Sequence, residues 1–170
     1  MNRRFAVGAI GATPLVLSAC GSPPVKTFAT LASAIAAIES LANGHRLASS
    51  WSLAQMLNHA AQSVEFSLRG FPELKSAAFR ATVGSAAFAW FDARGAMNHG
   101  LDEAIPGAPP LAADAALPEA IARAVKALRD FDAHSGALAP HFAYGALDKP
   151  QYTRAHLMHL ANHWSQVSAA

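Results

Sequence analysis

The chain has 170 residues, of which 52% are hydrophobic and 14% charged, and its 13 basic residues nearly balance its 11 acidic ones. This length suits one ordinary domain behind a short N-terminal segment, and the absence of any run of Lys or Arg excludes a nucleic-acid partner. A single cysteine, Cys20, leaves no partner for a disulfide within the chain, so any chemistry must come from histidine, carboxylate and hydroxyl groups.

The first residues have the layout of a secretory signal. Arg3 and Arg4 precede an apolar stretch, residues 5–17, that is shorter than the roughly 20 residues needed to span a bilayer. The letters LSAC that end at Cys20 resemble the lipobox of bacterial lipoproteins, which implies cleavage before Cys20 and attachment of lipid to its thiol. The alternative is an ordinary signal peptide with a chance cysteine.

These features divide the chain into three parts. We expect residues 1–19 to be a lipoprotein signal peptide, residues 20–26 to be the lipidated cysteine with a short proline-containing tether, and residues 27–170 to be the folded domain. The protein would then be exported to the cell envelope and anchored to a membrane on the periplasmic side through Cys20. Loss of the signal arginines would leave the mature domain formally neutral.

The first two predicted helices come from apolar residues that recur at steps of three and four. Residues 27–44 form the first of them, with Gly44 as its C-terminal cap. Residues 49–72 contain the second, which begins at a capping serine, Ser50 or Ser52, and ends at Gly70. The apolar positions of the two are Phe28, Leu31, Ile35, Ile38 and Ala42, followed by Leu53, Met56, Leu57, Ala60, Val64 and Leu68, with His59 on the flank of the second stripe.

Three more helical segments follow. Residues 76–100 form the third, with Phe88 and Trp90 expected in the core, and it stops before a stretch rich in Pro and Gly that cannot continue a helix. Residues 118–136 form the fourth, with Pro in its first turn. A loop leads from there to the last helix, which starts near Gln151.

No period-two alternation or hairpin signal is present, so the sequence predicts an all-α fold. Five helical segments with a four-helix core describe the pattern best, as a bundle with an extra short helix or a long crossover loop. Metal and cofactor sites in such bundles are built inward from facing helices.

Three of the eight histidines lie in the last helix. His156, His159 and His163 share one face, because residues three and four apart are neighbours on a helix. His159 and His163 have the best spacing for one metal ion, and His59, on the edge of an apolar stripe, is the natural third ligand. The same spacing also fits half-buried histidines that hydrogen-bond across the core, and His156 is expected beside the site or at the surface. Structural roles are expected for the remaining histidines, His45, His99, His134 and His141.

Residues 51–72 and 140–166 resemble an uncharacterised branch, a domain of unknown function, of the DinB-like superfamily of four-helix bundles. The similarity lies in a Trp-Ser helix start with a histidine eight residues on, an aromatic-Gly-Leu loop with one residue inserted here, and a final helix with His-x-x-x-His followed by Gln. These features fall on Trp51, Ser52, His59, Tyr144, Gly145, Leu147, His159, His163 and Gln166. The resemblance implies a DinB-like bundle whose three histidines bind a divalent metal such as zinc or nickel. The chain departs from it at Asn162 and Ser165, where relatives often have histidine and arginine.

Three protein ligands leave a coordination position open, which is typical of catalytic metal sites. Hydrolysis or group transfer on a small-molecule substrate is the corresponding reaction class. Tyr144, His141 and Glu65 are the candidates for proton transfer. Thiol transfer, the chemistry of cytoplasmic relatives, suits an exported domain less well. The alternative function is a non-catalytic periplasmic module that binds a metal, a small ligand or an envelope partner. The sequence leaves the oligomeric state open.

Overall fold

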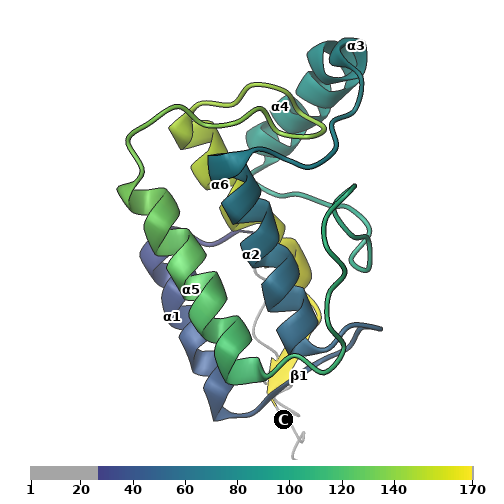
Figure 1. The fold of residues 1–170 in the computed structure, drawn as a ribbon. Coiled ribbons are helices and arrows are strands. Elements are labelled where there is room, and N and C mark those ends of the chain that lie inside the picture. The colour runs from purple at the N-terminus through teal and green to yellow at the C-terminus, as the bar shows by residue number, and fades with distance from the viewer. Residues whose placement is uncertain (1–26, 170) are drawn as a thin grey trace, which may run out of the picture.

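Four helices make the body of the molecule: α1 (Leu31–Ser40), α2 (Leu53–Arg69), α5 (Leu117–Ala133) and α6 (Lys149–Trp164) (Figure 1). The computed structural model describes residues 27–169, and the expected signal peptide and lipidated Cys20 lie outside them. The predicted all-α bundle is confirmed. None of the helices in residues 27–169 combines the length and apolar character needed to cross a membrane.

The helix starts follow from local sequence. In α1, α2 and α6 the side chain of the residue before the helix accepts a hydrogen bond from the third backbone N–H, and the third side chain contacts the cap backbone in return. Ser52 is the cap of α2, as predicted, and its partner is Gln55. Asp148 caps α6, which therefore begins two residues before the predicted Gln151. These caps fix where each helix begins, and so which side chains face inward.

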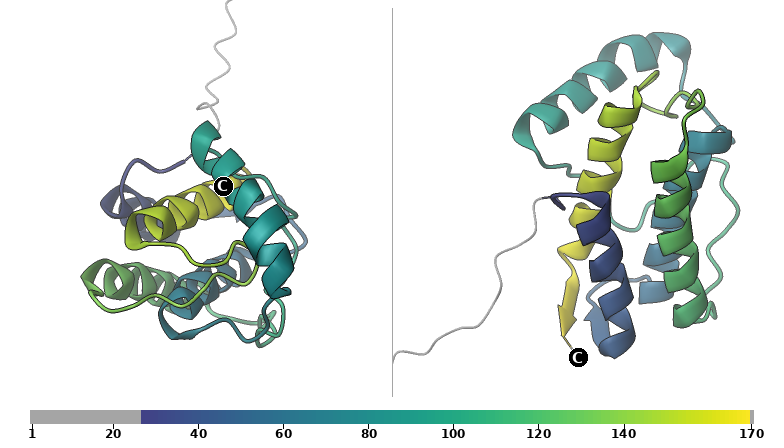
Figure 2. Two further views of the ribbon diagram at one scale, coloured as in Figure 1. Left: turned by 90° about the horizontal axis from the view of Figure 1, so that it is seen from above. Right: turned by 90° about the vertical axis from the view of Figure 1, so that its left-hand side faces the viewer.

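Each helix packs on two neighbours around the bundle. Both α1 and α2 contact α5 and α6, so α1 and α2 lie at opposite corners (Figure 2). Helices α2 and α5 run parallel and α6 runs antiparallel to both, so a long crossover must connect α2 to α5. The guanidinium of Arg123 on α5 makes two 2.9 Å hydrogen bonds to the Glu65 carboxylate of α2 and ties the parallel pair together.

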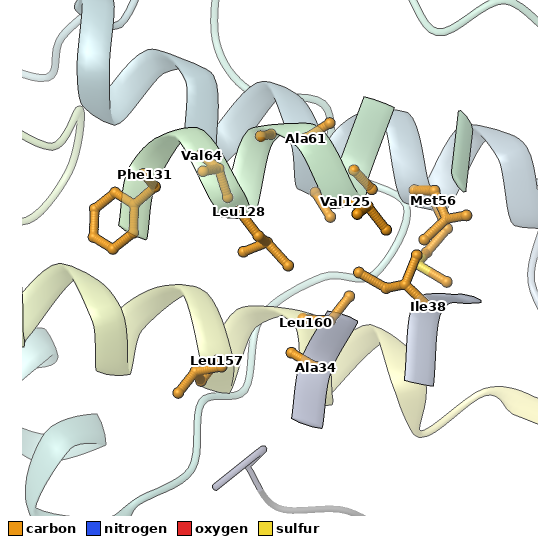
Figure 3. Packing of buried hydrophobic residues seen from close by; sticks show 14 of the residues in the cluster. Ala34, Ile38, Met56, Ala61, Val64, Val125, Leu128, Phe131, Leu157 and Leu160 are labelled. Atoms are coloured by element: carbon orange, nitrogen blue, oxygen red, sulfur yellow. The ribbon is translucent and has the colours of Figure 1, made fainter. Parts of the chain in front are cut away.

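The core lies between the four helices. Large side chains such as Ile38, Met56 and Phe131 are fully buried, and Figure 3 shows them and their neighbours between the helices. Buried alanines, among them Ala34, Ala61 and Ala161, let the helix backbones approach closely. The apolar positions read from the sequence lie in this core, with Leu31, Ile35, Leu53 and Leu68 at its edge. Ala42 is the exception: it is exposed, because α1 ends at Ser40, so its predicted place on the stripe is wrong.

The third predicted helix lies outside the bundle. A short turn of helix, α3 (Ala77–Phe79), continues through a π-helical turn, η2 (Arg80–Gly84), into α4 (Ser85–Arg94), which packs on α6 (Figure 2). Gly95 ends it in a left-handed conformation with φ of 60°. The predicted extension to residue 100 is therefore wrong, because glycine stops the helix five residues earlier. Trp90 is 61% exposed, so its predicted place in the core is wrong as well.

Two connections close the space beside α2 and α6. Residues 95–116 run back along α2, where Gln62 donates a 3.0 Å hydrogen bond to the carbonyl of Pro109 and Gln55 a 3.3 Å bond to that of Leu111. Residues 134–148 join α5 to α6, and the Tyr152 hydroxyl donates to the carbonyl of Ala139 at 2.7 Å. Both connections are thus held by side chains of the helices they cover.

A short antiparallel strand pair, which no sequence pattern predicts, completes the fold. After the 3₁₀ turn η1 (Leu41–Asn43), strand β1 (His45–Leu47) pairs with β2 (Val167–Ala169) at the end of the chain, with His45 opposite Ala169. Three residues are too few to show an alternating pattern. The pair joins the chain after α1 to the chain after α6.

Gly84 allows the outer helix to touch the loop before α6. A Cβ atom there would overlap the carbonyl group of Ala143, with the carbonyl carbon at 2.9 Å. We expect Gly84→Ala to lower the free energy of unfolding by roughly 2 kcal/mol, because the loop must move away. Val83→Ala, at a neighbouring side chain that is 59% exposed, should change it by less than about 0.5 kcal/mol. Urea unfolding of the two variants measures the difference, and equal stability would contradict the close contact.

Candidate metal centre

Helices α2 and α6 bring three histidines to one point. His59 lies in the middle of α2, and His159 and His163 lie one turn apart on α6, which runs antiparallel to it. The Nε2 atom of His159 is 3.1 Å from Nε2 of His59 and 3.1 Å from Nε2 of His163. The three potential ligand atoms all lie within 4.8 Å of one another. The predicted convergence of these side chains from two distant segments is confirmed.

Burial keeps these imidazoles neutral. Loss of solvent, with a smaller contribution from the nearby His99, lowers the pKa of His59 to about 4. Burial, with the neighbouring His59 and His99, lowers the pKa of His163 to about 3, and the same causes hold the pKa of His159 well below its ordinary value. At neutral pH all three therefore offer uncharged nitrogen, which is the form that binds metal.

The close approach of the nitrogen atoms in this triad (His59, His159, His163) is explained better by a shared cation than by hydrogen bonds between the rings. An imidazole nitrogen has a single in-plane position for a proton or a lone pair. Nε2 of His159 faces two other Nε2 atoms at 3.1 Å, so one proton cannot make a well-directed bond to both. A divalent ion about 2.0–2.1 Å from each nitrogen would satisfy all three. The donor set thus fits a divalent metal ion.

The triad has an aromatic wall on one side and a cavity on the other. The Trp51 ring stacks on His163 with the centroids 6.2 Å apart, and it also lies 5.0 Å from the His59 ring. A cavity of about 210 Å³ opens beside His59 and His159. It is lined by residues of α2, α6 and both connections, including Ser63, Met97, Glu103, His141, Tyr144 and His156.

Two of the predicted proton-transfer candidates line this cavity. The His141 ring stacks on Tyr144 with the centroids 4.2 Å apart, and its Nδ1 accepts backbone N–H bonds from Ala143 and Tyr144, both at 3.2 Å. Those bonds place the proton of the neutral ring on Nε2. The Tyr144 hydroxyl has a weak contact, 3.9 Å, with the Met97 sulfur, and burial raises its pKa to about 12.

The third candidate, Glu65, lies elsewhere. Its carboxylate pairs with Arg123 and with Arg69 across 2.9 and 2.7 Å, and those arginines lower its pKa even though burial acts in the opposite direction. Glu65 therefore links α2 to α5 and does not line the cavity that the triad faces.

His156 is buried beside the triad. Its Nε2 lies 3.2 Å from the hydroxyl of Ser67, and its ring packs edge-on against Phe131 with the centroids 4.9 Å apart. The alternative of a surface position is thus wrong, because this face of α6 turns toward the core.

Sequence reasoning missed one residue, His99. It was expected to have a structural role at a helix end, but it lies in the connection after α4, and its ring is 4.9 Å from that of His159 and 5.2 Å from that of His163. No periodicity marks this position, because it is outside a helix. The remaining two, His45 and His134, line neither the triad nor the cavity.

Burial of His156 predicts a pH-dependent stability. Its pKa is lowered from 6.5 to about 3 by burial. Between pH 6.5 and pH 3 the ring is therefore protonated in the unfolded chain and neutral in the folded protein. The stabilising contribution is present above pH 6.5 and is lost as pH falls through that window. With metal removed by chelator, we expect His156→Gln to reduce the loss of unfolding free energy between pH 7.5 and 5.5 by about 1.4 kcal/mol.

Ser67→Ala is the matched control for that change. It removes the hydroxyl that contacts His156 but leaves the titrating ring in place, so the pH dependence should stay that of the wild type. Urea unfolding at the two pH values measures both variants, and an unchanged loss in His156→Gln would contradict the burial argument.

Comparison with known proteins gives a family and no activity. No curated protein and no solved structure matches the chain. A family described as "Protein of unknown function (DUF1569)" matches residues 25–170, which contain the whole bundle, the triad and both connections. The chain therefore belongs to this family of unknown function.

Proposed function

We propose that this protein is a lipid-anchored, DinB-like metalloprotein that holds zinc or nickel through His59, His159 and His163 and acts as a metal-dependent hydrolase or transferase on a small molecule. The observation that carries the proposal is the meeting of three neutral Nε2 atoms from two helices at the wall of a cavity. The likeness of residues 51–72 and 140–166 to the DinB-like superfamily supports the same ligand set.

The open side of the triad favours a reactive site over a purely structural one. Structural zinc sites are closed by four protein ligands, whereas catalytic ones keep a position free. Here the cavity of about 210 Å³ adjoins His59 and His159, which leaves room for a substrate group next to the ligands. A divalent ion in the triad would supply Lewis-acid activation of a carbonyl or phosphoryl oxygen.

Two residues that line the cavity, His141 and Tyr144, can orient the substrate and transfer a proton. His141 has its Nδ1 occupied by two backbone N–H groups and its pKa lowered to about 3 by burial, so its free nitrogen carries a proton and can only donate a hydrogen bond. Tyr144 keeps its phenolic proton at neutral pH because burial raises its pKa. We assign His141 to orienting a substrate oxygen, and Tyr144 to donating a proton to a leaving group.

Charged groups sit at the edge of the cavity. Lys75 and Glu103 both line it, and both are exposed side chains of the connections around the site. The Lys75 ammonium lies 5.4 Å from the centre of the Phe79 ring. A mainly apolar cavity with charged residues at its edge suits a small, mostly apolar substrate that carries a polar reacting group.

The cellular place of the protein is part of the proposal. The basic and apolar N-terminal stretch and the letters LSAC support export, cleavage before Cys20 and lipid attachment at its thiol. The described domain would then work at the periplasmic face of an envelope membrane.

The first test is metal binding by the full-length protein, purified in detergent without a histidine tag. We expect about one zinc or nickel ion per chain, and an affinity at least roughly 100-fold lower in His59→Ala, His159→Ala and His163→Ala, because each removes a ligand. His134→Ala, at a histidine that does not line the cavity, should bind as the wild type does. Elemental analysis and zinc titration measure both.

If the wild-type protein binds neither zinc nor nickel, the metal site is wrong and the triad is a cluster of hydrogen-bonded core histidines. Where metal does bind, ester, amide and phosphate substrates compared with the ion present and removed separate the two functional classes. An enzyme turns over at least one of them only with metal, whereas a non-catalytic binding module turns over none.

The second test concerns the anchor. Cys20→Ala should move the protein from the membrane fraction to the soluble fraction and abolish incorporation of labelled fatty acid, because the thiol that would carry the lipid is gone. Cell fractionation and labelling measure this. If the variant stays on the membrane as the wild type does, the proposed anchor is wrong.

A further inference from the structure

We propose that His99 is a fourth nitrogen donor to the ion, supplied by the connection between α4 and α5 rather than by the bundle helices. This inference rests on the proposed function, since it concerns the ion that the triad would hold. Within the triad the ring centroids are 4.9 to 5.0 Å apart, and the His99 ring lies 4.9 Å from His159 and 5.2 Å from His163. The His99 ring therefore packs against His159 as closely as the ligands pack against each other, and against His163 only 0.3 Å less closely.

The hydrogen bonding of His99 prepares it to donate a lone pair. Its Nδ1 lies 2.7 Å from the carbonyl oxygen of Gly100, and because a carbonyl only accepts, Nδ1 carries the proton of the neutral ring. Nε2 is then left with its lone pair, and this atom is buried without a hydrogen-bond partner among the described residues. A backbone carbonyl on one ring nitrogen and a metal on the other is the usual arrangement of histidine ligands.

The ligand helix itself holds His99 in place. The side chain of Asn162, next to His163 on α6, donates a 3.3 Å hydrogen bond to the backbone carbonyl of His99. This contact ties the connection to α6 beside the triad.

The fourth donor differs from the other three in position, because His99 lies on a connection and the other three lie on bundle helices. His99 is not among the residues whose ligand atoms all lie within 4.8 Å of one another, so its ring must shift toward the ion to bind. A residue on a connection can make that shift without moving a helix. His99 also lines the cavity, which places it where a substrate group would approach. It is therefore a displaceable donor that closes the site until a substrate enters.

Cobalt(II) is a suitable probe, because its visible absorption reports the number and kind of its ligands. We compare full-length wild type, His99→Ala and His134→Ala, and we check by circular dichroism that each variant keeps its helices. His99→Ala should bind cobalt at least roughly 10-fold more weakly and show an altered visible spectrum. Added imidazole should restore the wild-type spectrum in this variant, while His134→Ala should match the wild type throughout.

The outcomes separate the two proposals. Weaker binding with an unchanged cobalt spectrum means that His99 only packs beside the ligands, and it overturns the fourth-donor role while the triad stands. Equal affinity and equal spectra in wild type and His99→Ala overturn it too. Failure of the wild type itself to bind cobalt overturns the metal site and this inference with it. His99→Gln, a second variant with a polar side chain of similar size, should show the same spectral change if His99→Ala fails to fold.

Discussion

The candidate site depends on the register between two antiparallel helices. His59 on α2 faces the turn of α6 that carries His159 and His163, and a shift of either helix by one turn, about 5.4 Å, would separate the rings. Caps at Ser52 and Asp148 fix where the two helices begin. The packing of the bundle thus brings the three triad side chains together.

Burial has two opposing effects at this point. It lowers the pKa of each triad histidine, so that the nitrogens stay uncharged and available at neutral pH. It also leaves Nδ1 of His59 and Nε2 of His99 without hydrogen-bond partners within residues 27–169, at a cost of about 1–3 kcal/mol for each. The alanine-rich core around them offsets this cost by close packing. An ion bound to Nε2 of His99 would recover part of the cost at that atom.

How far the sequence predicts this structure depends on periodicity. Regular apolar stripes predict α2 and α5 above all, and the i, i+4 pair His159 and His163 is visible for the same reason. The predicted caps are confirmed for α2, whereas α5 begins without a side-chain cap and ends at Ala133 instead of the predicted Gly136. His59 was found because it lies on the edge of such a stripe. His99 was not, because a residue in an irregular connection is placed by long-range contacts such as that with Asn162. Two other features are not predictable from periodicity. The strand pair β1–β2 is too short to show a pattern, and the early end of α4 depends on the backbone conformation of one residue, Gly95.

The division between helices and connections bears on how function varies within the family. Helices α2 and α6 supply the triad, and their positions are constrained by the core. The other cavity groups that bear on the chemistry, His99, His141 and Tyr144, lie on the two connections, which the core constrains less. Substitutions there can change what enters the cavity, and which groups donate protons, without disturbing the ligands. For the proposed reaction, the residues that would select a substrate are to be sought in the segments 95–116 and 134–148.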